Sequence, residues 1–252
     1  MTKEYLISII TVVKNGENTI EKCIKSVLDQ NYKNIEYIII DGNSSDKTKK
    51  IIDKYKNKIS LTISENDNGI WDAMNKGIKL AKGEILGFIN ADDFYYENSL
   101  EIVNKYFNDN NIDFLFGTVE KHKIMHGYNP SIIKWSFGFY TSHSVGFFIK
   151  TKKHKEVGFY NTEYLSADLD FFYKMIVNSK LKGISTHKNE VFGKFGKGGF
   201  SSKINYIDHL LDLNKIRLNN NQGWLFVNIL FLLKIIKKPL KFLISLYKKI
   251  FN

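Results

Sequence analysis

Short apolar runs alternate with amphipathic segments over the first part of the chain. Residues 6 to 13 read LISIITVV, apolar or β-favouring residues that predict a central strand buried on both faces. Comparable runs predict further strands, at residues 35–40, 59–64 and 85–89. Apolar positions at helical spacing predict the intervening helices, at residues 20–28, 47–55 and 70–81. This β-α-β-α-β-α-β order predicts a doubly wound α/β fold with a mostly parallel sheet, right-handed crossovers and helices on both faces.

The pattern is less regular beyond the strand at residues 85–89. It predicts helices at residues 95–107, 166–178 and 204–218, and strands at residues 113–119 and 182–195. Residues 120 to 165 are rich in aromatic side chains and follow neither the helical nor the strand period, so no element is predicted there. Residues 195–202, FGKGGFSS, are predicted to form a glycine-rich loop.

The last segment, residues 219 to 252, has a pattern of its own. Residues 224–233 are almost entirely apolar, but this run is too short to cross a bilayer. Lysines then recur along one helical face between Lys234 and Lys248, and Pro239 is expected to kink this helix or to start a new one. A basic amphipathic tail suits the surface of an anionic membrane. The alternative is that its apolar face packs on the rest of the chain or on a second subunit.

The 252-residue chain carries a net charge of +11, and the segment after Trp224 contains six lysines and no acidic residue. A basic balance suits nucleic acid, anionic lipid or phosphorylated substrates. The chain shows no zinc-ligand spacing, RNP-type strand or helix-turn-helix, so nucleic acid is not an expected partner. Its single cysteine, Cys23, cannot form an internal disulfide, and the N-terminus lacks the long apolar core of a signal peptide. These features predict a cytoplasmic protein.

Two adjacent carboxylates, Asp92 and Asp93, follow the buried strand at residues 85–89. Like charges so close repel one another, and burial raises the free-energy cost, unless a cation neutralises them. Ligands of open α/β sheets bind at the carboxyl ends of the strands, so this pair is the candidate metal and substrate centre. The alternative is two solvated turn residues that cap the next helix. Polar residues end the other strands too: Thr11, Asn15, Asp41, Glu65 and Asp67.

Several stretches of the chain resemble the family 2 glycosyltransferases, in particular bacterial enzymes that build surface polysaccharides. The matching text lies within residues 5 to 205 and reads SIITVVKNGENTIEKCIKSVLDQNYKNIEYIIIDGNSSDKT, SENDNGIWDAMNKGI, GEILGFINADD, SADLDFF and GGFSS. The resemblance implies a GT-A nucleotide-sugar fold, a divalent metal and inversion at the anomeric carbon. It also implies a domain at residues 1–218, with a nucleotide-sugar-binding half (1–93) and an acceptor half (94–218), followed by the basic tail (219–252).

The resemblance assigns the donor-binding residues. The end of the first strand, residues 11–15 with Thr11, Val13 and Asn15 among them, would line the nucleoside pocket. Asp41 would read the base, because a carboxylate can accept the uracil imide N–H; the alternative is a turn aspartate that bonds its own backbone. Asp67 and Gly69 would lie near the base or the phosphates, and the alternative for this pair is an ordinary Asx turn.

The family's Asp-x-Asp-like motif corresponds to residues 90–93, where Asn90 stands at the first acidic position. Asp92 and Asp93 would share the metal and ribose contacts, and Asn90 would also face the nucleotide-sugar. The metal would be Mg²⁺ or Mn²⁺, which take oxygen ligands and leave coordination sites for phosphate oxygens. Asp168 corresponds to the second residue of the family's Glu-Asp pair, the usual catalytic base, although Ala167 replaces the glutamate.

Alternatives remain at the acceptor side. Asp170 is the second candidate for the base, and both aspartates would otherwise only stabilise the N-terminus of their helix. Many relatives carry a phosphate-binding arginine at a position that is Met74 here. The candidates for the missing phosphate contacts, or for contacts with the acceptor, are Lys76, His143, Lys194, Lys197, Gly198, Gly199 and Ser201. A packed core histidine is the alternative for His143.

Together these features predict an inverting, metal-dependent hexosyltransferase-type enzyme. It would transfer a sugar from a nucleotide-diphosphate donor, UDP-linked by expectation, to a hydroxyl of a glycan or lipid-linked glycan in cell-surface polysaccharide biosynthesis. The tail would hold it on the cytoplasmic face of the inner membrane through residues 224–252. The alternatives are a nucleotidyltransferase, for which Lys14-Asn15-Gly16 is a poor triphosphate loop, and a non-catalytic carbohydrate- or partner-binding module on a degenerate fold.

Overall fold

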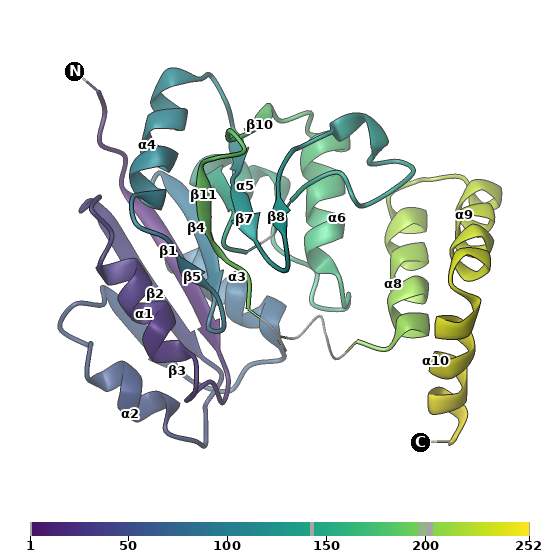
Figure 1. The fold of residues 1–252 in the computed structure, drawn as a ribbon, viewed down its shortest axis with the longest axis horizontal. Helices are drawn as coiled ribbons and strands as arrows, with labels where there is room; N and C mark the ends of the chain where they lie inside the picture. Colours follow the sequence, from purple (N-terminus) through teal and green to yellow (C-terminus); the bar gives the residue numbers. More distant parts are fainter. Residues whose placement is uncertain (1, 142–143, 197–198, 200–203, 252) are drawn as a thin grey trace.

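The computed structural model describes residues 2–141, 144–196, 199 and 204–251. In this part of the chain a seven-stranded sheet has the order β10-β6-β9-β4-β1-β2-β3 (Figure 1). Only β9 runs antiparallel to its neighbours. The strands of this sheet are β1 (Ile7–Val13), β2 (Ile35–Asp41), β3 (Leu61–Ser64), β4 (Ile85–Asn90), β6 (Phe114–Phe116), β9 (Phe147–Lys150) and β10 (Gly183–Ser185).

Helices cover both faces of the main sheet. The helices of the first two-thirds of the chain are α1 (Ile20–Leu28), α2 (Thr48–Asp53), α3 (Ile70–Leu80), α4 (Ser99–Asp109), α5 (Thr151–Val157) and α6 (Ala167–Tyr173). Alternate residues of β1 enter two different cores because strand side chains point to opposite faces. Ile9 packs with side chains of α1 and α4, whereas Ile10 packs with side chains of α3 and α6. The predicted doubly wound arrangement is therefore confirmed.

A smaller sheet of four strands crosses the carboxyl end of β4. Its order is β5 (Phe94–Tyr95), β11 (Val191–Lys194), β7 (Thr118–Glu120) and β8 (Ile124–Met125). The prediction of a single strand at residues 182–195 is wrong. This segment forms two strands, β10 in the main sheet and β11 in the smaller sheet. A turn separates the two, closed by the bond from the Glu190 N–H to the His187 carbonyl, 3.0 Å. The chain therefore returns beside β5, next to the candidate metal residues.

Other boundaries also differ from the prediction. The strand expected at residues 113–119 is broken at Gly117, where a Cβ atom would lie 2.3 Å from the Phe192 ring. The helix expected at 166–178 is α6 followed by a π-helical turn, η2 (Lys174–Asn178). Within the unassigned segment 120–165 the chain forms β8, the short 3₁₀ helix η1 (Pro130–Ile132), β9 and α5.

The C-terminal part of the chain forms three helices that pack against one another: α8 (Tyr206–Asn219), α9 (Trp224–Lys237) and α10 (Pro239–Phe251). We call them the C-terminal lobe; it lies beside α6 at one end of the molecule (Figure 1). Pro239 starts a new helix, in agreement with one of the two predicted outcomes. The Tyr206 hydroxyl donates to the Lys234 carbonyl at 3.1 Å, which joins α8 to α9. No helix among the described residues is long and apolar enough to span a bilayer.

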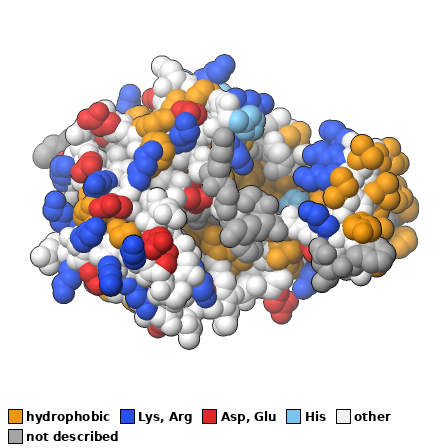
Figure 2. Space-filling model, turned by 60° about the horizontal axis from the view of Figure 1, so that its bottom comes forward, with side chains coloured by type: hydrophobic (Ala, Val, Ile, Leu, Met, Phe, Trp, Pro, Cys, Tyr) orange, Lys and Arg blue, Asp and Glu red, His pale blue; other side chains and the backbone are white. Residues whose placement is uncertain are grey.

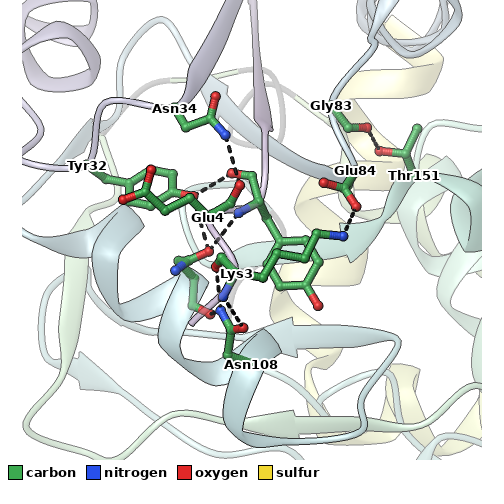
Figure 3. A network of polar contacts seen from close by, with 10 residues as sticks. Lys3, Glu4, Tyr32, Asn34, Gly83, Glu84, Asn108 and Thr151 are labelled. Carbon is green, nitrogen blue, oxygen red and sulfur yellow. Dashed lines mark hydrogen bonds and ion pairs between the residues drawn. The ribbon is translucent and has the colours of Figure 1, made fainter. Parts of the chain in front are cut away.

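Polar side chains fix the N-terminal segment at the opposite end of the strands from the candidate site (Figure 3). The Asn34 amide donates to the Glu4 carbonyl at 3.0 Å, and the Asn108 amide donates to the Lys3 carbonyl at 2.8 Å. Lys3 also forms an ion pair with Glu84, just before β4. These contacts hold the entry to β1 against β4 and α4, so both central strands deliver their carboxyl ends to one place.

Candidate active site

A cavity of about 1000 Å³ opens at the carboxyl ends of β1 and β4. It extends from the loop after β1, across the end of β4 and the start of α6, to the C-terminal lobe. Figure 2 shows a hollow between the larger body and that lobe. The cavity brings together predicted residues that are far apart in sequence: Val13, Asn15, Asp67, Gly69, Asn90, Asp92, Asp168 and Gly199.

Two residues predicted for the nucleoside pocket are placed differently. Thr11 is fully buried, two residues before the end of β1, and its hydroxyl oxygen lies 3.1 Å from the Tyr37 hydroxyl. Asp41 is fully buried too; its carboxylate accepts hydrogen bonds from the Ser44 N–H at 3.2 Å and from the Ser64 hydroxyl at 2.6 Å. Neither side chain lines the cavity. In this structure the Asp41 carboxylate therefore makes the local turn contacts of the alternative interpretation.

The adjacent aspartates point in different directions. Asp92 lines the cavity, and burial raises the pKa of its carboxyl. Asp93 is buried, and both of its oxygens are bonded: one accepts from the Ser144 hydroxyl at 2.6 Å, and the other from the Gly196 N–H at 2.7 Å. Burial, together with the nearby Asp92 charge, raises the pKa of Asp93 to about 7. Asp93 thus anchors the segments around residues 144 and 196 to the end of β4.

Asn90 and Asp92 are the candidate metal ligands that face the cavity. The buried Oδ1 atom of Asn90 has no hydrogen-bond partner among the described residues. A carboxylate and an amide oxygen at one strand end fit a hard divalent cation, which leaves further coordination positions for phosphate oxygens. No group of three His, Cys, Asp or Glu side chains that could hold a metal occurs in the part of the chain that the structure describes. A metal held by Asn90 and Asp92 would have coordination positions left for oxygens of a bound nucleotide.

The glycine-rich segment reaches the same strand end. A Cβ atom on Gly196 would lie 2.2 Å from the Asp92 carbonyl oxygen, and one on Gly199 would lie 2.8 Å from Asp92 Oδ2. At Gly196 only glycine allows this close approach to the backbone. Gly198, Ser201, Lys197 and His143, which were candidates for phosphate or acceptor contacts, lie outside the described residues.

The two candidate bases of α6 have different surroundings. Asp168 lines the cavity, and the Tyr140 hydroxyl donates to its Oδ2 at 3.3 Å. Burial and the Asp168 charge raise the pKa of Tyr140 well above its usual value, so the hydroxyl stays a donor. Asp170 is buried, accepting from Lys174 Nζ at 2.7 Å and from the Asn220 amide at 2.7 Å. Only Asp168 has access to a ligand in the cavity.

The predicted lysine contacts are directed elsewhere. Lys76 Nζ lies 2.8 Å from Glu65 and 3.4 Å from Asp72, and it also donates to the Asn66 carbonyl. Lys194 is paired with Glu120 at 2.7 Å. Met74, at the position where relatives carry an arginine, lines the cavity as an apolar side chain. The structure therefore supplies positive charge to the cavity from other residues.

Sequence reasoning missed several polar residues that line the cavity: Lys121, Tyr140, Tyr206, His209 and Lys241. Lys14 directly follows β1 and belongs to the strand end, residues 11–15, that was expected to line the nucleoside pocket. Lys241 was placed on the basic face of the tail and assigned only to lipid. Tyr206 and His209 carried no signal, because α8 contributes to the cavity only through the packing of the C-terminal lobe.

The family model for glycosyl transferase family 2 matches residues 8–172, which is more than half of the chain. The chain therefore belongs to the family 2 glycosyltransferases, and the resemblance inferred from its motifs is confirmed. The matched region contains β4, Asp92, Asp168 and all of β1 except Ile7, so the cavity's sheet side and the start of α6 fall within it.

Two curated relatives from Escherichia coli are named UDP-Glc:α-D-GlcNAc-diphosphoundecaprenol β-1,3-glucosyltransferases. WfgD is 37% identical over 118 residues, which cover 46% of this chain and 47% of the relative. WfaP is 34% identical over 133 residues, which cover 52% of this chain and 48% of the relative. The chain thus matches about half the length of each.

Solved structures of glycosyltransferases share the fold. The structure of Staphylococcus aureus TarS in complex with UDP-GlcNAc has a TM-score of 0.67 at 19% identity, covering 83% of this chain and 65% of TarS. The mannosyltransferase PcManGT from Pyrobaculum calidifontis, in complex with GDP-Man and Mn²⁺, has a TM-score of 0.67 at 17% identity, covering 88% and 66% of the two chains. The predicted GT-A fold is therefore confirmed.

Proposed function

We propose that the protein transfers a sugar from a UDP-sugar to a hydroxyl group of a lipid-linked glycan, with inversion at the anomeric carbon. The observation that carries this proposal is the position of Asp92 and Asp168 in one cavity, at the carboxyl ends of β1 and β4. One carboxylate faces the site of a nucleotide diphosphate and the other can receive a proton. A single base on the acceptor side suits direct displacement, which inverts the anomeric centre.

The donor end would bind the nucleotide-sugar through residues that follow the strands. Asn15, Asp67 and Gly69 would contact the nucleoside, and Asn90 and Asp92 would face the diphosphate; all five residues line the cavity. A bound Mg²⁺ or Mn²⁺, held by Asp92 and Asn90, would supply Lewis-acid stabilisation of the negative charge that develops on the leaving diphosphate. Lys14 and Lys121 add positive charge to the same cavity, where Met74 provides none.

Asp168 is the proposed general base. Its carboxylate would accept the proton of the acceptor hydroxyl as that oxygen attacks the anomeric carbon. The hydrogen bond from Tyr140 leaves one carboxylate oxygen of Asp168 available to the acceptor and fixes the orientation of the group. Asp170 is not assigned a chemical role, because Lys174 and Asn220 occupy its two oxygens.

The choice of UDP and of a lipid-linked acceptor is supported by the names of the relatives. WfgD and WfaP are named for transfer from UDP-Glc to a diphosphoundecaprenol-linked sugar, and TarS was solved with UDP-GlcNAc. We extend to this chain the UDP donor, the lipid-linked acceptor and a role in cell-surface polysaccharide biosynthesis.

The C-terminal lobe is the proposed membrane contact, on the cytoplasmic face of the inner membrane. The large apolar side chains of α9 and α10 are exposed, among them Trp224, Leu225, Leu232, Ile236, Leu240 and Leu243. Figure 2 shows this apolar surface on the outer side of the lobe, with basic side chains beside it. Apolar residues that enter the lipid interface and lysines that attract anionic headgroups are what a peripheral anchor requires.

The test is turnover of nucleotide sugars by the purified protein. A synthetic lipid-diphosphate N-acetylglucosamine serves as acceptor, and a panel of UDP-, GDP- and TDP-sugars is offered with Mn²⁺, with Mg²⁺ and with EDTA. The proposal predicts metal-dependent transfer or slow hydrolysis of at least one UDP-sugar. Glycan binding with no metal-dependent binding of any nucleotide would instead favour a non-catalytic carbohydrate-binding module and would contradict the proposal.

A further inference from the structure

We infer that the C-terminal lobe contains an anion site that binds the phosphate groups of the acceptor. The site, which we call the basic cluster, consists of Tyr206 and His209 from α8, Lys234 from α9 and Lys241 from α10. This inference rests on the proposed function, because it names the acceptor chemistry that the distal end of the same cavity would recognise.

The basic cluster is formed by all three helices of the lobe and opens into the active-site cavity. Tyr206, His209 and Lys241 line that cavity. Lys241 Nζ lies 5.2 Å from the centre of the Tyr206 ring, and the Tyr206 hydroxyl donates to the Lys234 carbonyl at 3.1 Å. The packing of α8 against α9 and α10 therefore brings the backbone of Lys234 and the side chain of Lys241 next to Tyr206.

The lysines of the cluster lack an anionic partner. Among the described residues, neither Lys234 nor Lys241 has a carboxylate within 4.0 Å, whereas Lys249 of the same tail is paired with Asp208. Burial and the nearby positive charge of Arg217 lower the pKa of Lys234 to about 8. A partly buried cation such as Lys234 is stabilised by an anion that binds beside it.

The neighbouring acids do not fill this role. Asp212 of α8 accepts from the Leu165 N–H at 3.0 Å and from the Ser166 N–H at 2.8 Å, so both its oxygens hold the entry to α6. Burial and the charge of Lys234 lower the pKa of His209, whose Nδ1 lies 3.2 Å from the Ser166 hydroxyl oxygen. The cluster is thereby connected to the turn that precedes Asp168.

The position of the cluster favours a phosphate that carries both a sugar and a lipid chain. Asp168 lies on one side of it in the same cavity, and the exposed apolar faces of α9 and α10 lie on the other. In Figure 2 the basic side chains of the lobe gather on the side next to the hollow, and the apolar ones lie farther out. A diphosphate bound here would present its sugar hydroxyl toward Asp168 while its chain enters the membrane.

Phosphate groups can reach the cluster from other sources, and the experiment separates them. The probe is dodecyl diphosphate in neutral detergent micelles, titrated by calorimetry into the wild type, Lys241→Gln and the double variant Lys234→Gln/Lys241→Gln. Lys248→Gln is the matched control, because Lys248 is an exposed tail lysine with no role in the cluster. UDP binding with Mn²⁺ is measured for each variant, and vesicles containing phosphatidylglycerol report binding to bulk lipid. Circular dichroism verifies that each variant is folded.

Loss of charge-assisted hydrogen bonds should weaken dodecyl diphosphate binding about tenfold or more in the double variant and less than twofold in Lys248→Gln, with the UDP affinity unchanged. An equal loss of dodecyl diphosphate affinity in Lys248→Gln would mean that the positive charge of the whole tail, and not the basic cluster, binds the diphosphate. A loss of UDP affinity alone would assign it to the donor, and a loss of vesicle binding alone would assign it to lipid headgroups; each result overturns the inference. A wild type that binds dodecyl diphosphate through these lysines but turns over no UDP-sugar would keep the anion site and reject the proposed function.

Discussion

The two ends of the cavity are built on different principles. At the sheet end, polar side chains follow β1 and β4, and partners from distant segments hold them: Ser144 and Gly196 fix Asp93, and Tyr140 contacts Asp168. At the C-terminal lobe, Lys234 and Lys241 have no carboxylate within ion-pair distance among the described residues. The outer face of that lobe is apolar and exposed. At the sheet end, hydrogen bonds within the protein already position the polar side chains. In the part of the chain that the structure describes, the lobe instead has unpaired charge and exposed apolar surface that suit binding of a charged or apolar ligand.

The largest expected effect belongs to the sheet end and separates the two aspartates of α6. Asp168→Asn should lower kcat by about 10³-fold, because the amide cannot accept the acceptor proton and general base catalysis contributes about 10²–10⁴. KM for the donor should change little. The effect is measured with the UDP-sugar that the purified protein turns over. Single-turnover reactions report the transfer step, and kcat and KM are determined separately.

The matched control is Asp170→Asn. It removes the charge that Lys174 and Asn220 contact, so we expect a loss of about 1–3 kcal/mol of unfolding free energy with kcat retained in the folded fraction. If Asp170→Asn lost kcat and Asp168→Asn kept full activity, Asp170 would be the general base and Asp168 the structural residue.

A second comparison separates the aspartates that follow β4. Asp92→Asn should weaken Mn²⁺-dependent UDP binding by about 10²-fold, because its carboxylate faces the cavity and charge-assisted contacts to the metal are lost. Asp93→Ala should mainly lower the melting temperature, since it removes the acceptor for the Ser144 hydroxyl and the Gly196 N–H. Calorimetric titration of UDP with and without Mn²⁺, beside thermal unfolding, distinguishes the two. If both variants are folded and lose metal-dependent UDP binding equally, Asp92 and Asp93 would both have to be metal ligands.

The sequence was sufficient for the first four strands of the chain and for a polar site where those strands end. Apolar runs and their spacing predicted β1, β2, β3 and β4, and strand ends pointed to Asp92 because ligands bind where parallel strands end. Which of two neighbouring aspartates faces the cavity was not predictable. That choice depends on hydrogen bonds to Asp93 from residues 51 and 103 positions away.

The lobe was the least predictable part of the site. The lysine pattern indicated a basic helical face, but a face is defined within one helix, and the cavity is lined by side chains of α8 and α10 together. Residues 120–165 followed no period because aromatic packing orders them: the Tyr140 and Phe172 rings lie 4.9 Å apart, for example. Contacts of this kind join segments that local pattern cannot relate.

A smaller effect is expected at the apolar face of the lobe. Leu232→Asp, at a position that is 56% exposed in α9, should weaken binding to phosphatidylglycerol vesicles about tenfold or more. Burial of a leucine side chain contributes about 1.5–3 kcal/mol, and the added carboxylate is repelled by anionic lipid. Leu61→Asp, at a position that is 36% exposed in β3, is the control and should not change vesicle binding. Flotation of the full chain in a density gradient provides the measurement, and equal flotation of both variants would exclude the lobe as the anchor.

The smallest expected effect is the pH dependence of diphosphate binding at the lobe. The pKa of Lys234 in the free protein is about 8, lowered by burial and by Arg217, so rising pH removes the charge that an anion would contact. A bound diphosphate raises that pKa, and its affinity should therefore fall up to about tenfold between pH 7 and pH 9. The groups around Lys234 include His209, Asp212, Arg217 and Lys241, and the lowered pKa of His209 keeps it neutral over this range. The same shift predicts that the free energy of unfolding rises as pH increases from about 8 toward 10.5, because the unfolded chain then binds more protons.

Lys234→Gln should abolish this dependence of dodecyl diphosphate affinity on pH and leave the UDP profile unaltered. Calorimetric titrations at pH 7, 8 and 9 in buffers of different ionisation enthalpy report both the affinity and the number of protons taken up on binding. About half a proton should be taken up near pH 8 by the wild type and none by Lys234→Gln, since one amine that is half protonated when free becomes fully protonated when bound. Proton uptake that persists unchanged in Lys234→Gln would place the titrating group outside the basic cluster. Proton uptake would then no longer distinguish the lobe from the sheet end of the cavity.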